Sequence, residues 1–239
     1  MKIRIKIFNI RKYLSVMCAL ALLSLFVLPA YASDIDTLQE RLVKVYIDKV
    51  YTHSNDVSST TIAGYLATQQ ADGHWTCINY TSRAWGPVSG SGVCGSEVSK
   101  NSPRIHLKRL LEMASAYVRT ESTHYHSEAL PKGISNGLTY WFDNWAYQDA
   151  SHQVPADKIN PLDFYFAQIG YQMYLGPTLL IMEPYLSADV LSSGATHLKD
   201  PAGEAMNLAE IANQAIWRGL LNESLTDVKK GLDAIKNHM

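Results

Sequence analysis

The stretch that decides the fold is S-P-R-I-H-L-K-R-L-L-E-M-A-S-A-Y, residues 102–117. Ser102-Pro103 predicts a helix start, because a capping side chain is followed by a proline whose missing N–H costs nothing in a first turn. The apolar residues that follow recur every three or four positions, the spacing of one buried helix face. They are Leu107, Leu110, Leu111, Ala114 and Tyr117.

Outward from this stretch, helical spacing recurs along the chain and no run shows the strict alternation of a strand. Helices are predicted over 34–53, 57–70, 134–147, 162–183 with an interruption at Gly176-Pro177, from Leu208 to Ile216, and from a capping-box-like Ser224-x-x-Asp227 to the end. Residues 71–102, 149–161 and 192–204 are predicted loops. The pattern predicts one all-α domain with its long loops gathered on one face, where they build a site.

The first 32 residues have the features of a signal peptide. Lys2, Arg4, Lys6, Arg11 and Lys12 precede an apolar run that ends before Ala30-Tyr31-Ala32, an A-x-A cleavage site. The run is shorter than the roughly 20 residues that span a bilayer, which disfavours the alternative of an uncleaved anchor. We therefore expect a secreted or periplasmic protein of residues 33–239, with no stable membrane insertion after cleavage.

Charge and cysteines narrow the function further. Five of the 21 basic residues lie in 1–32, so 16 remain against 22 acids, a net charge of −6 that argues against nucleic-acid binding. Cys77 and Cys94 are disulfide candidates in an oxidising compartment, with two free thiols as the alternative. Their spacing predicts no metal site, and His124-x-His126 is interpreted as a solvated loop.

Aromatic residues are the strongest functional signal. Sugar rings stack on aromatic planes, so a Trp- and Tyr-lined cleft suits an oligosaccharide. Trp141, Trp145 and Trp217 lie on apolar helix faces and are predicted core. The residues near loops are the candidates for substrate binding: Trp75, Tyr80, Trp85, Phe164 and Tyr165.

Several motifs, in order, resemble polysaccharide lyase family 8, which includes hyaluronate, chondroitin AC and xanthan lyases. Asp72-Gly73-His74-Trp75 with Ile78-Asn79-Tyr80 is similar to its "DGSW…I.Y" segment, and residues 106–117 to its next helix. Phe164-Tyr165 stand where the family has Trp-Trp in "NWW..EIG.P", and Asp163 replaces the asparagine. Leu175-Gly176-Pro177 continues the match.

The family's catalytic asparagine, in "TGAN", has two possible positions. Gly194-Ala195-Thr196 looks similar but places Thr at the key position and leaves too long a gap before Arg218-Gly219-Leu220-Leu221. Counting back from Arg218 without a gap gives Asn207, which we prefer, and makes 192–203 a loop variant.

The resemblance implies an all-α fold, an incomplete α/α toroid of antiparallel helical hairpins followed in the family by β-sandwich domains. It implies β-elimination on a uronate-containing polysaccharide such as hyaluronan or chondroitin. Asn207 would be catalytic, Arg218 would join the aromatic residues in binding substrate, and no cofactor would be needed.

The resemblance also implies a missing part. The family's catalytic His and Tyr follow the asparagine by some tens of residues, whereas only 32 residues follow Asn207 here. We expect an N-terminal lyase segment whose partners are an anionic polysaccharide and the missing C-terminal lyase domains. The alternatives are a non-catalytic carbohydrate-binding module and a glycoside-hydrolase toroid, for which nothing pairs the available carboxylates: Asp143, Asp149, Asp163 and Glu204.

Overall fold

The computed structural model describes residues 32–47, 58–80, 103–145, 159, 169–201 and 205–237. In these ranges the helices are α2 (Ala32–Val45), α3 (Ser59–Thr68), α4 (Arg104–Val118), α5 (Ala129–Asn144), α6 (Gln172–Met182), the 3₁₀ helix η4 (Glu183–Tyr185), α7 (Ala188–His197), α8 (Ala205–Leu221) and α9 (Leu225–Lys236). The β pairing of these ranges is limited to two isolated bridges, Gln69–Trp75 and Trp145–Ile159. The predicted all-α class is confirmed.

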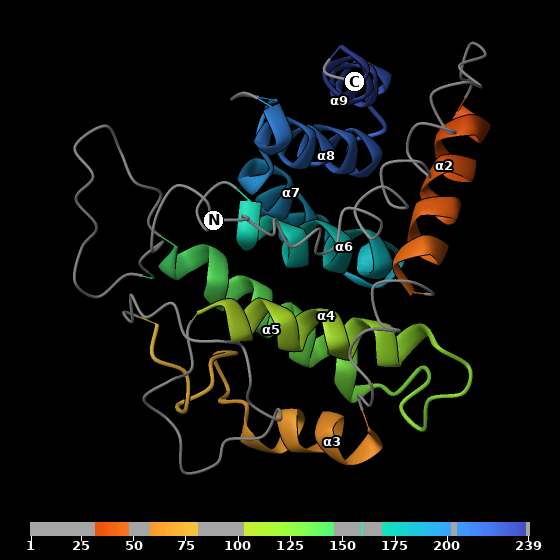
Figure 1. Cartoon of the computed structure of the whole chain (residues 1–239). Coiled ribbons are helices and arrows are strands. Elements are labelled where there is room, and N and C mark those ends of the chain that lie inside the picture. Colours follow the sequence, from red (N-terminus) through yellow and green to blue (C-terminus); the bar gives the residue numbers. More distant parts are fainter. Residues whose placement is uncertain are drawn as a thin grey trace, which may run out of the picture.

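The helices form two layers. Helices α4, α6 and α8 pack side by side in one layer, α5 and α7 form a second layer behind it, and α9 packs on α8 at the top of the view (Figure 1). The first layer is parallel, because Arg104 and Tyr174 join the starts of α4 and α6, while Val118, Ile181 and Leu221 near the ends of α4, α6 and α8 line one pocket. Each helix of the second layer runs back, which gives antiparallel hairpins. Helix α3 covers α4 and α5, and α2 covers α6 and α8.

Helix α4 is the centre of the fold. It contacts α3, α5 and α6, so nearly its whole circumference is buried. The predicted core stripe is confirmed: Leu107, Leu110, Leu111, Ala114 and Tyr117 are all at most 8% exposed. A helix enclosed on several sides must also bury polar residues, here His106, Arg109, Glu112 and Ser115.

Local signals set several helix ends. The Ser224 hydroxyl accepts the Asp227 backbone N–H at 3.4 Å and caps α9, as predicted. Ser58 caps α3 in the same way through Thr61. Helix α4 begins directly after Pro103, while Ser102 lies outside the described residues.

Helix α5 begins at Ala129, five residues before the predicted start at Ile134. Pro131 lies in its first turn, where a missing N–H costs nothing, so it does not break the helix. Gly133 and Gly137 lie within the helix at points of close packing. Neighbouring side chains occupy the space that a Cβ at these positions would need: Leu66, Gln69, Leu110 and Met113.

Two further expectations were wrong in detail. Residues 188–197 form α7 rather than the start of a loop at 192, because Ser187 caps the helix and Gly194 packs on Leu179. Helix α6 continues through Gly176-Pro177, which were expected to interrupt it. Across the described helices, none combines the length and apolar character needed to cross a membrane.

Candidate functional site

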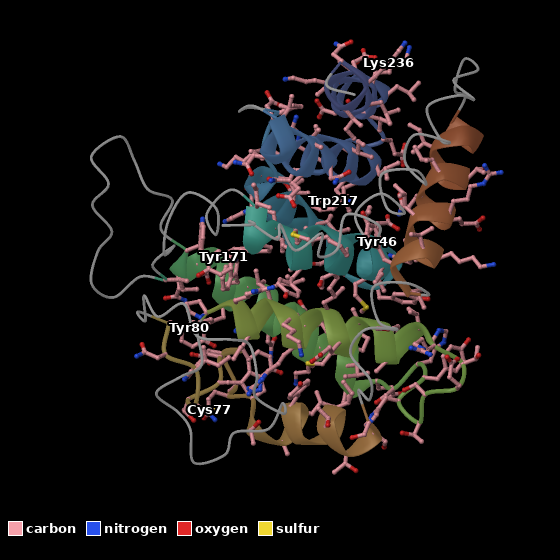
Figure 2. The ribbon with its side chains drawn as sticks, viewed as in Figure 1. Tyr46, Cys77, Tyr80, Tyr171, Trp217 and Lys236 are labelled. Carbon is pink, nitrogen blue, oxygen red and sulfur yellow. The ribbon has the colours of Figure 1, made fainter. Side chains whose placement is uncertain are left out.

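A buried histidine organises the segment 69–80 that precedes α4. His106 is fully buried, and its Nε2 lies 2.8 Å from the Gly137 carbonyl oxygen. Nε2 therefore carries the proton, and Nδ1 accepts the Tyr80 hydroxyl at 2.9 Å. That hydroxyl in turn accepts the Trp75 backbone N–H at 3.1 Å. Burial lowers the pKa of His106 to about 3, so the ring is neutral and fixes Tyr80, which is labelled in Figure 2, in place.

Trp75 does not line a surface cleft, and that prediction was wrong. Its side chain is 0% exposed, and Nε1 donates to the Tyr65 carbonyl at 2.9 Å. The Arg109 guanidinium lies over the Trp75 ring, 5.1 Å from the centroid, and over the Tyr65 ring at 5.0 Å. The indole is thus a core element that attaches the loop to α3 and α4.

The same cation contacts a cystine sulfur. Both terminal nitrogens of Arg109 lie 3.6 Å from Cys77 Sγ. Cys77 is disulfide-bonded, and Cys94 lies outside the described residues, so the Cys77–Cys94 pairing stays a prediction. Glu112 completes this cluster by accepting the Tyr65 hydroxyl at 2.8 Å, and burial together with the Glu112 charge raises the pKa of Tyr65.

Above this buried cluster, three partly exposed rings form an aromatic surface. The His74 ring stacks on Tyr140 with centroids 5.3 Å apart, and Tyr80 lies 5.2 Å from Tyr140. The His74 Nδ1 lies 2.6 Å from an Asp72 carboxylate oxygen, in a pair whose side chains are 28% and 59% exposed. Burial opposes the change, but hydrogen bonds from His74 lower the pKa of Asp72 overall. Tyr80, a predicted substrate residue, is therefore part of a surface that can stack on sugar rings.

A second aromatic group lies where α5 ends and α6 begins. Trp141 is 1% exposed and stacks on the half-buried Trp145 at 5.1 Å, and both pack edge-on against Tyr171 (Figure 2). The predicted core positions of Trp141 and of Trp217, at 4% exposed, are confirmed. The predicted Trp85, Phe164 and Tyr165 lie outside the described residues.

The starts of α4, α6 and α8 lie on the same side of the molecule, one above another (Figure 1). Arg104 in the first turn of α4 donates from Nε and Nη2 to the Tyr174 hydroxyl at 3.0 and 2.7 Å. Asn207 lies in the first turn of α8 and is exposed. Three positive helix dipole ends and a cation therefore lie along this side, which favours anions.

Arg218, the other predicted substrate residue, is mostly engaged within the fold. Its Nε and Nη2 bond both Asp227 oxygens at 2.9 and 3.0 Å, and Nη1 donates to the Leu198 carbonyl at 3.0 Å. Nη2 also bonds Asp200. Hydrogen bonding to Asp227 raises the pKa of the guanidinium.

His197 is the last residue of α7. Its ring lies 4.7 Å from Phe142 of α5, and Nδ1 lies 2.8 Å from the Ser193 carbonyl oxygen. Burial first, and then the positive charge of Lys199, lowers the pKa of His197. Sequence reasoning missed this residue, because 192–204 was interpreted as a loop.

The opposite end of the layer has the opposite charge. A pocket of about 340 Å³ lies between α2 and the ends of α4, α6 and α8. Among the described residues that line it, four are carboxylates and none is basic: Asp36, Glu40, Glu183 and Glu223. Of these two ends, as far as the described residues define them, the one that holds Arg104 and Asn207 is the more favourable for an anionic ligand. The described residues contain no group of three or more potential metal ligands.

Comparison with known proteins places the fold. The sequence model of the polysaccharide lyase family 8 N-terminal α-helical domain matches residues 45–239. No curated protein matches the sequence. Three solved structures resemble the chain. A Paenibacillus xanthan lyase has a TM-score of 0.61 and 20% identity, and the match covers 86% of this chain and 19% of that one. A chondroitinase AC lyase studied with oligosaccharides has a TM-score of 0.58, 18% identity and coverages of 81% and 26%, and a Streptomyces coelicolor A3 chondroitin AC lyase in complex with chondroitin sulphate has a TM-score of 0.56, 16% identity and coverages of 86% and 27%.

These likenesses confirm the expected α/α-toroid architecture of helical hairpins. At 16–20% identity, the structural likeness concerns the fold alone. The chain spans about a fifth to a quarter of the length of the three lyases.

Proposed function

Because the chain belongs to polysaccharide lyase family 8, whose N-terminal α-helical domain matches most of its length, we propose that it is the toroid part of a lyase acting on a uronate-containing polysaccharide. The observation that carries this proposal is the exposed Asn207 in the first turn of α8, the helix whose start lies on the same side of the molecule as the starts of α4 and α6. Hyaluronan and chondroitin are the first substrates to test, followed by xanthan and alginate.

The proposed chemistry begins at the uronate carboxylate. The C5 proton of a uronate becomes more acidic when its carboxylate is neutralised by hydrogen bonds, because the enolate-like transition state then carries less free charge. The Asn207 amide can donate such bonds, and the α8 dipole adds to the effect. The aromatic surface of His74, Tyr80 and Tyr140 supports the proposal, since it suits stacking against sugar rings.

A base must then remove the C5 proton, and an acid must protonate the leaving oxygen at C4. We assign neither role to a described residue of this chain. The family resemblance implies a histidine and a tyrosine that follow the asparagine by some tens of residues, and we propose that these come from the remainder of a lyase. The runner-up function is a carbohydrate-binding module without catalysis, which the same aromatic surface would serve.

The test follows the ultraviolet absorbance of the C4–C5 double bond when the purified protein is incubated with each polymer. We expect any signal to be lost in Asn207→Ala and kept in Asn222→Ala, because Asn222 is an exposed asparagine just beyond the other end of α8. Absence of a signal, with retardation in a polymer-containing gel that Asn207→Ala abolishes, would fit a lyase part whose base and acid come from the remainder. Retardation that Asn207→Ala leaves unchanged would leave the binding-module function. A protein that neither cleaves nor is retarded would refute both.

A further inference from the structure

Two side chains of α8 hold the segment 198–200, which follows α7. Gln214 is 0% exposed, and its Oε1 accepts the Lys199 backbone N–H at 3.1 Å. Arg218 donates from Nη1 to the Leu198 carbonyl at 3.0 Å and from Nη2 to the Asp200 carboxylate. Both the backbone and a side chain of the segment are therefore fixed to α8.

The same guanidinium also fixes α9. Arg218 binds both oxygens of Asp227, at 2.9 and 3.0 Å, in the paired geometry that makes such bonds strong. Lys230 of α9 reaches the second Asp200 oxygen at 2.5 Å. Four of the five guanidinium N–H groups thus bond protein acceptors, and the side chain is only 18% exposed. This use of the donors favours a role within the fold over direct contact with a polymer.

Helical geometry relates these side chains to Asn207. Gln214 and Arg218 follow Asn207 by seven and eleven residues, close to two and three helical turns, so all three lie on one face of α8. The segment 198–200 is consequently held on the face that carries Asn207, beginning about 10 Å along the axis from it. Lys199 and the end of α7 at His197 are brought to this face with it.

We propose that Arg218, together with Gln214, is a positioning residue that holds 198–200 as a wall of the polysaccharide site on the Asn207 face of α8. Lys199 then adds a cation to this wall, where an anionic sugar would lie. The inference rests on the proposed function and deepens it, because it assigns the specificity for anionic polymers to a segment that α8 and α9 hold jointly.

Two variants of Arg218 test this role. Arg218→Lys keeps the charge but loses the paired bonds to Asp227. The exchange Arg218→Asp with Asp227→Arg keeps an ion pair between α8 and α9, but it removes the guanidinium from Leu198 and Asp200. Retardation in gels containing hyaluronan, chondroitin, xanthan or alginate measures polymer affinity, and urea unfolding measures stability. Arg119→Lys, in an exposed pair with Glu121 at the far end of α4, is the matched control.

For Arg218→Lys we expect polymer affinity to fall roughly ten-fold, which corresponds to about 1.4 kcal/mol of binding free energy, with affinity unchanged in Arg119→Lys. The exchange variant should recover the urea midpoint but not the affinity. If either Arg218 variant fails to fold, Lys199→Gln should still lower affinity while leaving the urea midpoint unchanged.

Three results would overturn the proposal. Full recovery of affinity in the exchange variant would mean that the arginine only joins α8 to α9. Unchanged affinity in Arg218→Lys or Lys199→Gln would mean that the segment is not a wall of the site. A wild-type protein that is neither retarded nor active on any polymer would instead refute the proposed function itself, and the inference with it.

Discussion

The Trp217 indole occupies the space where a side chain on Gly176 would lie. A Cβ at Gly176 would come within 2.1 Å of the indole Cε3 atom, so this glycine lets α6 and α8 approach closely. The indole Nε1 then donates to the Tyr46 hydroxyl at 2.7 Å and connects α8 to the residues that follow α2. These two contacts of Trp217 therefore link α6, α8 and the end of α2.

Gly176→Ala should lower the free energy of unfolding by roughly 2–3 kcal/mol, because the added methyl group overpacks a rigid ring. Urea denaturation followed by circular dichroism measures the loss. Combining the change with Trp217→Leu serves as the control, since a smaller side chain leaves room for the methyl group and should remove most of the extra cost. Equal costs in the two backgrounds would show that the ring is not the obstacle.

Stability should decrease with acidification through His106. Its pKa is about 3 in the folded protein and about 6.5 when unfolded, so the unfolded state binds more protons between these values. The stability that the neutral His106 ring contributes is fully present above about pH 6.5 and is lost as pH falls toward 3. The free energy of unfolding should fall by up to about 1.4 kcal/mol per pH unit in this range.

Urea midpoints of the wild type and His106→Gln at several pH values measure this slope. A glutamine amide can still donate to the Gly137 carbonyl, but it does not titrate, so the variant should show a shallower acid loss. His126→Gln, at an exposed histidine, is the control and should follow the wild type. Parallel curves for wild type and His106→Gln would argue against the buried neutral ring.

The parts of the fold that were predictable depend on neighbours in sequence. The α4 stripe and the Ser224 cap are local patterns of spacing and hydrogen bonding, so they are visible without the fold. Helix α7 was partly missed because Gly194 is explained only by its packing on Leu179, which belongs to another helix. Gly- and Ser-rich composition was therefore interpreted as a loop at positions where small residues allow a helix to pack closely.

The site shows the same limit. Trp75 was predicted to be exposed because it lies in a loop, yet Arg109 and Tyr65 from two helices enclose it. Arg218 was predicted to bind substrate from its motif alone, and its bonds to Asp227 of α9 and to Asp200 after α7 depend on the tertiary fold. The sequence indicated which side chains could bind a sugar or an anion. Tertiary contacts decide whether those side chains are buried and which residues they bond.

Arg104 should contribute to polymer binding by its charge. It is half-buried beside Tyr174 at the end that holds Asn207, so Arg104→Gln should weaken retention of an anionic polymer about threefold, the effect of about 0.6 kcal/mol for a partly exposed charge. Affinity gels at low and high salt measure it, and salt should shrink the difference. Arg119→Gln at the opposite end should have no effect. A loss as large in Arg119→Gln would indicate a general charge effect instead.

Removing the Cys77 sulfur bond should destabilise the segment before α4. We expect Cys77→Ser, or reduction, to lower the free energy of unfolding by roughly 3 kcal/mol if the partner closes a short loop. Peptide mapping of the unreduced protein should recover a Cys77–Cys94 linked pair. A free Cys94 thiol in the folded, oxidised protein would contradict the predicted pairing.

Gly73 should not tolerate any side chain. Its φ is +97°, a region that disfavours residues with a Cβ, and an added Cβ would lie 2.1 Å from the Asn136 carbonyl oxygen. Since that oxygen belongs to the backbone of α5, it cannot rotate away as a side chain would. Gly73→Ala should therefore displace the loop and lower the free energy of unfolding by roughly 3 kcal/mol or more, combining overpacking with backbone strain.

Urea denaturation gives the stability of Gly73→Ala, and tryptophan fluorescence reports whether water reaches the Trp75 indole, which the loop keeps buried. Ala71→Gly, two residues away at an exposed position, is the control and should change stability by less than about 1 kcal/mol. If Gly73→Ala were as stable as Ala71→Gly, with Trp75 still shielded, the close contact between this loop and α5 would be wrong. The hydrogen bonds that join Trp75, Tyr80 and His106 would then need another explanation.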